Sequence, residues 1–224
     1  MQFKKHIPNA ITCGNLLSGC VGIVYAFNGD LKTVAFFVLL SGILDFFDGL
    51  AARLLNVKSD IGKELDSLAD VISFGFLPGV IMFQMLQNLQ MGNWAYLGFS
   101  ITIFSALRLA KFNVDTRQTE DFIGLNTPTN TFFIISLPWL IVDFPSINNS
   151  YLLIAVILIT SYLLVSELYL FSLKFTGLAW EPNKYKFILI IISIVLLAFI
   201  KFAAIPVILV LYILFSQLHF KYTK

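Results

Sequence analysis

The chain has 224 residues, of which 58% are hydrophobic and only 12% are charged, and its formal net charge is +2. A typical soluble domain carries about 25% charged residues, and a water-soluble globule of this size has too little interior to hide so much apolar surface. Intrinsic disorder requires low hydrophobicity and is excluded as well. The composition predicts an all-α polytopic membrane protein, and the small net charge gives no reason to expect a nucleic-acid partner.

Eight apolar stretches are long enough to cross about 30 Å of hydrocarbon as helices. In chain order they cover about residues 8–28, 32–54, 65–88, 93–112, 128–144, 150–168, 186–201 and 203–219. The last two are divided at Lys201 because an unbroken helix from Phe187 to Phe220 would be about 51 Å long. Pro206 suits this division, since proline is tolerated in the first turn of a helix.

The basic residues fall almost entirely on one side of these eight predicted spans. With the N-terminus inside, only Lys32 and Lys201 of the fifteen lysines and arginines lie outside. Short cytoplasmic loops retain an excess of positive charge. The distribution therefore predicts an N-in/C-in protein of the cytoplasmic membrane.

Four aspartates stand within predicted spans, where a carboxylate costs at least about 2.5 kcal/mol on insertion scales. Asp45 and Asp48 close the second span, and Asp66 and Asp70 open the third. Spacings of three and four residues place each pair on one helical face, and the short link between the spans predicts that they are antiparallel neighbours. Clustered carboxylates repel one another unless cations compensate, and an all-oxygen ligand set suits Mg²⁺, Mn²⁺ or Ca²⁺ rather than zinc. We expect a site for two divalent ions near the cytosolic interface.

Small residues and one arginine accompany the four acids. Gly49, Ala52 and Gly62 leave room for a ligand, although small residues also serve helix packing in membranes. Arg53 follows Asp48 by about one turn, where it suits a phosphate or reaches the membrane surface. Metal ions beside an arginine at a membrane interface indicate phosphate chemistry on a lipid, with one carboxylate taking the proton of an attacking alcohol.

The spacing of these residues resembles the signature of the CDP-alcohol phosphatidyltransferases. All eight fixed positions of D-x2-D-G-x2-A-R-x8-G-x3-D-x3-D are present between Asp45 and Asp70. The resemblance implies a six-helix core around a polar cavity open to the cytosol, two Mg²⁺ or Mn²⁺ ions held by the four aspartates, and Asp70 as the general base. It implies a CDP-linked lipid donor, CMP as the leaving group, and nucleotide-facing positions at Gly49, Ala52, Arg53 and Gly62.

Further segments resemble the bacterial and archaeal phosphatidylserine synthases of that family. They are Ile7–Asn9, Thr12, Asn15–Leu16, Ser67–Gly75, Arg108–Asn113 and Phe122–Pro128, where Asn126 replaces a proline of the F-x-G-L-P-x-P element. The similarity covers about residues 6–176. We therefore expect a catalytic core in residues 1–176 and a separate helical hairpin in residues 177–224. The resemblance implies transfer from CDP-diacylglycerol to L-serine, and family members commonly form homodimers.

Polar residues at the predicted cytosolic side suit the two substrates. For the acceptor, Arg108 and Lys111 can bind the serine carboxylate, and the pocket is completed by Asn113, Asn126 and Thr127. For the donor, the candidates are Asn9, Thr12 and Asn15. Each has a structural alternative: membrane anchoring for the two cations, capping or loop roles for the acceptor-side polar residues, and helix packing for the donor-side ones.

Two other functions fit parts of the pattern. Glycerol 3-phosphate or inositol phosphate are alternative acceptors, but a phosphorylated acceptor demands more cations than Arg108, Lys111 and Arg117 supply. An ion or proton transporter also uses acids within the membrane. A transporter needs polar residues along the depth of a span, whereas the outer halves of residues 32–54 and 65–88 are apolar.

Overall fold

The computed structural model describes residues 2–57, 59–117, 121–173, 175, 177 and 179–222. Apart from two short strands, these residues are helical or lie in connecting turns. The elements are α1 (Gln2–Phe27), α2 (Leu31–Leu54), α3 (Asp60–Asp70), the π-helical segment η1 (Val71–Phe76), α4 (Leu77–Asn88), the 3-10 segment η2 (Gly92–Phe99), α5 (Ser100–Val114), β1 (Phe122–Ile123), α6 (Thr127–Asp143), the 3-10 turn η3 (Pro145–Ile147), α7 (Ser150–Val165), β2 (Tyr169–Leu170), α8 (Trp180–Ile200), the 3-10 turn η4 (Lys201–Ala203) and α9 (Ala204–Tyr222).

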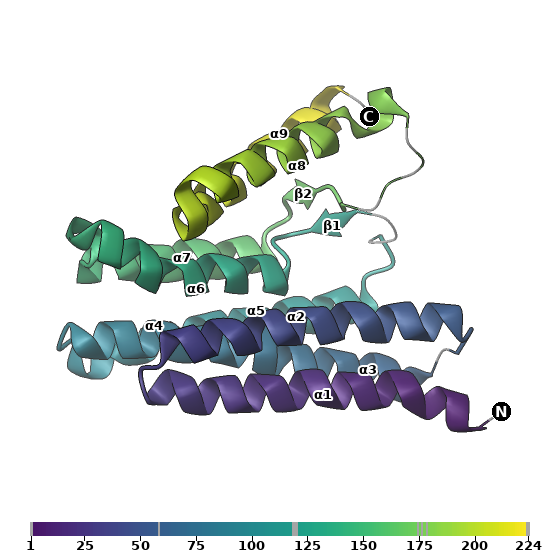
Figure 1. Ribbon diagram of the computed structural model, residues 1–224, viewed down its shortest axis with the longest axis horizontal. Coiled ribbons are helices and arrows are strands. Elements are labelled where there is room, and N and C mark those ends of the chain that lie inside the picture. Colours follow the sequence, from purple (N-terminus) through teal and green to yellow (C-terminus); the bar gives the residue numbers. More distant parts are fainter. Residues whose placement is uncertain are drawn as a thin grey trace.

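The helices run back and forth along one axis. Figure 1 shows α1 to α5 as one group, α6 and α7 beside it, and α8 with α9 as an inclined hairpin on the far side of α6 and α7. The start of α1 and the end of α9 lie towards the same end of the molecule in Figure 1.

Five helical segments of the described chain are long and apolar enough to cross a membrane. They are His6–Phe27, Leu31–Leu54, Asp60–Asn88, Gly92–Val114 and Trp180–Tyr222. The helices α6 and α7 are shorter, with 17 and 16 residues. The expected all-α polytopic membrane architecture is confirmed, whereas the eight crossings and their N-in/C-in orientation stay predictions.

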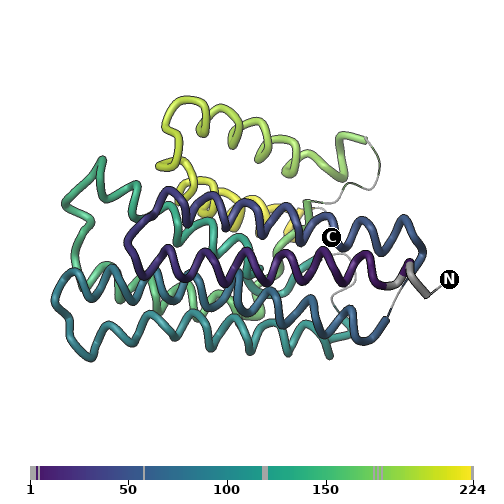
Figure 2. The backbone as a smooth tube through the Cα atoms, turned by 60° about the horizontal axis from the view of Figure 1, so that its bottom comes forward, coloured from purple at the N-terminus to yellow at the C-terminus, as the bar shows by residue number. Residues whose placement is uncertain are grey.

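The 43-residue segment Trp180–Tyr222 is bent into two helices. Lys201 has a φ of +49°, and η4 reverses the chain so that α9 packs back against α8 (Figure 2). Pro206 stands in the first turn of α9, where the missing N–H has no helical partner to lose. The turn therefore lies where the sequence predicts it.

The third predicted span, residues 65–88, differs from the structure both before Asp66 and after Asp70. Its helix begins at Asp60, five residues before the predicted start, because the Ser59 hydroxyl caps it by accepting from the Gly62 N–H at 3.0 Å. Directly after Asp70 the helix widens into η1. Neighbouring hydroxyls satisfy carbonyls of η1: Thr131 Oγ1 donates to Phe74 O at 2.8 Å, and Thr102 Oγ1 donates to Gly75 O at 3.1 Å. Side chains of adjacent helices thereby stabilise an irregular backbone at membrane depth.

Two apolar cores hold the helices together. The larger one includes Val38 of α2, Met82 of α4, Ile134 of α6 and Ile157 of α7. The smaller core joins the segment before α6 and the β2 region to the C-terminal hairpin, through Leu125, Leu170, Phe171, Leu189, Leu209 and Tyr212. Many large apolar side chains on the outside of the helices are exposed, as a surrounding bilayer requires.

Candidate metal and substrate site

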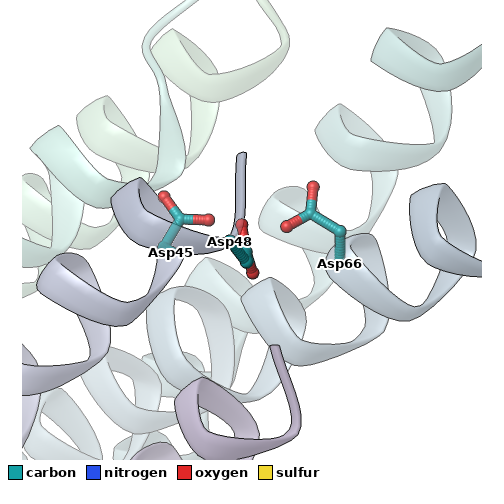
Figure 3. Close-up of side chains that lie close together, drawn as sticks. All are labelled: Asp45, Asp48 and Asp66. Carbon is teal, nitrogen blue, oxygen red and sulfur yellow. The ribbon is translucent and has the colours of Figure 1, made fainter. Parts of the chain in front are cut away.

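The four aspartates converge near one end of the bundle. Carboxylate oxygens of Asp45, Asp48 and Asp66 all lie within 4.8 Å of one another. In Figure 3, Asp45 and Asp66 extend their carboxylates into a shared space from two different helices, with Asp48 between them. Asp70 is buried one turn after Asp66 and lines the same cavity as the other three. This compact, all-oxygen donor set fits a hard divalent cation.

The helix α1 orients two of these carboxylates. Thr12 Oγ1 donates to Asp48 Oδ2 at 2.7 Å, and Asn15 Nδ2 donates to Asp70 Oδ1 at 3.4 Å. The main helix contacts beside the site run from α1 to α2 and from α1 to α3. The predicted direct neighbours α2 and α3 are thus joined mainly through α1. This packing leaves room for a ligand between their acidic faces.

A first cavity of about 490 Å³ lies between α1, the end of α2 and the start of α3. It is lined by Pro8, Asn9, Thr12, Asp48, Gly49, Ala52, Val57, Ser59, Asp60, Gly62, Lys63 and Asp66. A Cβ at Gly49 would have no heavy atom of the described residues within 4 Å, whereas a Cβ at Gly62 would lie 2.9 Å from Ser59 Oγ and 3.1 Å from Asn9 Oδ1. Gly62 therefore permits a close approach, and Gly49 leaves space for a ligand.

Five of the seven residues expected on the donor side line this first cavity, whereas Arg53 and Asn15 do not. The Arg53 side chain is exposed, and its Nε donates to Gly49 O one turn earlier at 3.0 Å. Its guanidinium covers the end of its own helix. The expected phosphate contact of Arg53 stays a prediction.

A second cavity of about 480 Å³ shares Asp48, Gly49, Lys63 and Asp66 with the first. Its wall includes all four aspartates, together with Arg108, Asn113, Asn126 and Thr127 from the expected acceptor set. Arg108 is only 6% exposed, and its Nε has no hydrogen-bond partner among the described residues. Its Cζ stands 5.6 Å from the centre of the Phe112 ring. Because buried polar groups are normally paired, this N–H is a donor available to an anionic ligand.

Three of the other expected acceptor residues have side-chain partners, whereas the buried Thr127 Oγ1 has no hydrogen-bond partner among the described residues. Lys111 forms an ion pair with Glu167 and does not line the second cavity. Asn113 Nδ2 donates to Ser67 Oγ at 2.8 Å. Asn126 caps α6 by accepting from the Thr129 N–H at 2.8 Å, and it also faces the cavity. For Asn126 the capping role and the lining position coexist.

Sequence reasoning missed Lys63, which lines both cavities. Its Nζ donates to Asn113 O at 2.7 Å and so ties the start of α3 to the end of α5. Lys63 directly follows Gly62 at an unspecified position of the signature, so only the three-dimensional arrangement identifies it. Ser67, a second missed residue, is brought into the second cavity by the same face of α3.

Comparison with known proteins places these residues in a family. The family model described as CDP-alcohol phosphatidyltransferase matches residues 5–166. The chain is 30% identical over 196 residues to the CDP-diacylglycerol–serine O-phosphatidyltransferase of Helicobacter pylori, an alignment that covers 84% of this chain and 80% of that protein. It is 35% identical over 124 residues to the enzyme of the same name from Bacillus subtilis (55% and 70% covered). It is 31% identical over 165 residues to the archaetidylserine synthase of Methanothermobacter thermautotrophicus (72% and 68% covered).

Proposed function

We propose that this chain, which belongs to the CDP-alcohol phosphatidyltransferase family, transfers the phosphatidyl group of CDP-diacylglycerol to the hydroxyl of L-serine and releases CMP. The observation that carries the proposal is that two cavities meet at the acidic cluster. Asp48 and Asp66 line both of them, so a donor in the first cavity and an acceptor in the second would react between the aspartates. The names of three relatives support serine as the acceptor.

The four aspartates would hold two Mg²⁺ or Mn²⁺ ions. When bound, such ions would neutralise the charge of the diphosphate and the charge that develops as CMP departs. Thr12 and Asn15 keep two of the carboxylates in place through the hydrogen bonds to Asp48 and Asp70. Partners of this kind typically raise metal affinity by fixing the orientation of a ligand.

Asp70 is the proposed general base. The serine hydroxyl oxygen forms a bond to the β-phosphorus of CDP-diacylglycerol, and its proton passes to the Asp70 carboxylate. The bond from the β-phosphorus to the bridging oxygen breaks, and CMP leaves with the electron pair. Asn9, Gly49, Ala52 and Gly62 would form the nucleotide side of the first cavity.

The cations of the second cavity favour a carboxylate over a phosphate on the acceptor. Arg108 and Lys63 line it, whereas Lys111 pairs with Glu167 and Arg117 pairs with Asp115 and Glu167. Arg108 would bind the serine carboxylate through its guanidinium. Asn113, Asn126 and Thr127 would contact the rest of the amino acid.

The membrane arrangement completes the proposal. Residues 1–176 form the catalytic core in this view, and residues 177–224 form an added hairpin. The chain is N-in/C-in in the cytoplasmic membrane, with the site open to the cytosol, because the basic residues gather on that side. Soluble serine and CMP then enter and leave from the cytosol, while the lipid tails stay in the bilayer.

The test is CMP release from CDP-diacylglycerol by membranes that contain this protein. L-Serine, glycerol 3-phosphate and inositol phosphate are supplied separately, with Mg²⁺, with Mn²⁺ or with a chelator. We expect release with serine and a divalent ion, and none with the chelator or in membranes without the protein. Release with another alcohol but not with serine would refute the acceptor assignment, and absence of release with every alcohol would refute the transferase activity.

A further inference from the structure

A two-residue strand pair stands directly before the acceptor residues. In this antiparallel pair Phe122 of β1 faces Leu170 of β2, and Ile123 faces Tyr169. The next two amides bind the chain at the end of α7: Gly124 N donates to Leu168 O at 2.8 Å, and Leu125 N donates to Leu163 O at 2.8 Å. Asn126 and Thr127 follow at once, so the position of β1 sets where these two residues meet the second cavity.

Gly124 lets the segment before Asn126 pack closely against the end of α7. Gly124 has a φ of +79°, which side chains rarely adopt, and a Cβ there would lie 2.7 Å from Leu164 O. The segment before Asn126 therefore follows any displacement of β2 and of the end of α7. A two-residue strand pair has little stability of its own, so other contacts must hold β2.

The helix α9 supplies those contacts from one face. Tyr212 Oη donates to Phe171 O at 2.9 Å, and Phe171 N donates to Ser216 Oγ at 3.3 Å. Gln217 Nε2 donates to Tyr169 O at 2.8 Å. The spacing of four residues between Tyr212 and Ser216 places them on one side of the helix. The backbone N–H and the backbone C=O of Phe171 are thus both hydrogen-bonded to side chains of α9. Phe171 and Ser216 are fully buried.

Apolar packing also joins α9 to the segment before Asn126. Leu125, which directly precedes Asn126, shares a buried cluster with Phe171, Leu209 and Tyr212. The contacts of α9 therefore reach the residue directly before Asn126. Figure 1 shows β1 and β2 between the hairpin and the rest of the bundle.

We infer that α9 holds the acceptor cavity in its binding geometry, with Tyr212 and Ser216 as positioning residues for the acceptor alcohol. This inference rests on the proposed transferase function. It assigns a role to a helix that lies beyond residues 5–166, the part of the chain that the family model matches. The first cavity is lined by α1, the end of α2 and the start of α3, so the inferred role concerns the acceptor and not the CDP-lipid.

The kinetic test uses the full chain in lipid nanodiscs with Tyr212→Phe, Ser216→Ala and the double variant. Each single change removes one buried hydrogen bond to Phe171, which corresponds to roughly a fivefold rise in the KM for serine. The KM for CDP-diacylglycerol is expected to stay within twofold of the wild-type value. Tyr162→Phe is the matched control, because it removes the hydroxyl of an exposed tyrosine on α7. An unchanged KM for serine, or equal rises in both KM values, would overturn the inference.

A second measurement does not depend on activity. Hydrogen exchange followed by mass spectrometry reports the protection of the amides of residues 121–127 in the same nanodiscs. We expect faster exchange there in Tyr212→Phe and Ser216→Ala, and wild-type exchange in Tyr162→Phe. Wild-type protection of residues 121–127 in the double variant would refute the positioning role, whether or not serine is the substrate. If the wild-type protein uses a different alcohol, the same KM comparison is made with that alcohol, and only the acceptor assignment fails.

Discussion

Replacement of Arg108 by glutamine tests the acceptor cavity most sharply. The guanidinium is 6% exposed, its Nε has no hydrogen-bond partner among the described residues, and it lines the second cavity beside Asp70. If it binds the serine carboxylate, Arg108→Gln removes a charged hydrogen bond worth about 1.5–3 kcal/mol. This loss corresponds to a rise in the KM for serine of about 10- to 150-fold.

The assay compares serine with ethanolamine, which has the same hydroxyl and ammonium groups but no carboxylate. The wild-type protein should prefer serine strongly, and Arg108→Gln should lose most of that preference while the KM for CDP-diacylglycerol stays unchanged. Arg117→Gln is the control, since this exposed guanidinium is bound by Asp115 and Glu167 and does not line the cavity. An undiminished preference for serine in a folded Arg108→Gln protein would refute the assignment of the carboxylate to Arg108.

Three further predictions follow from the same geometry. Asp70→Asn should lower CMP release by at least about a hundredfold, because the proton acceptor is lost; near-normal turnover would exclude Asp70 as the base. Thr12→Val removes the 2.7 Å hydrogen bond to Asp48 and should raise the Mg²⁺ concentration for half-maximal CMP release by about tenfold or more, whereas an unchanged Mg²⁺ titration would show that Thr12 does not support the metal site. Asp30 accepts hydrogen bonds from the Thr33 hydroxyl and amide, and these bonds lower the pKa of its carboxyl group. Asp30→Ala should therefore lower the thermal stability at pH values above the unfolded-state pKa of about 4. This difference in thermal stability should vanish as the pH falls through the lower folded-state pKa. A thermal-stability difference that persists at low pH would exclude the ionised cap as its source.

The acidic cluster was predictable because its members stand three and four residues apart within two neighbouring helices. Spacings of three and four residues place Asp45 with Asp48, and Asp66 with Asp70, on single helical faces, and the cost of carboxylates in a bilayer indicates that they serve a site. The resemblance to the CDP-alcohol phosphatidyltransferases, which rests on the same residues, is confirmed by the family match to residues 5–166. The α1 contacts that orient Asp48 and Asp70 join residues 36 and 55 positions apart, and no local spacing encodes those pairs.

The cationic residues show where local reasoning ends. Arg53, Arg108 and Lys111 all stand near the predicted cytosolic side, and nothing in their spacing separates a ligand-binding cation from one at the membrane edge. In the fold, Arg53 binds its own helix, Lys111 pairs with Glu167, and Arg108 alone of the three lines a cavity. Partner choice among long side chains depends on which helix ends meet, and this is a property of tertiary packing.

By itself, the sequence determined that this is a helical membrane protein, that the chain reverses at Lys201, and to which family it belongs. Each of these depends on composition, on the length of apolar runs or on spacing along one or two helices. Only the tertiary structure decided that Asp48, Asp66 and Lys63 line two cavities at once and that the helix widens after Asp70. It also decided that α9 binds Phe171 and so supports the segment before Asn126. These features arise where segments distant in the sequence satisfy one another's polar groups, and buried polar groups in a membrane protein have to be satisfied within the protein.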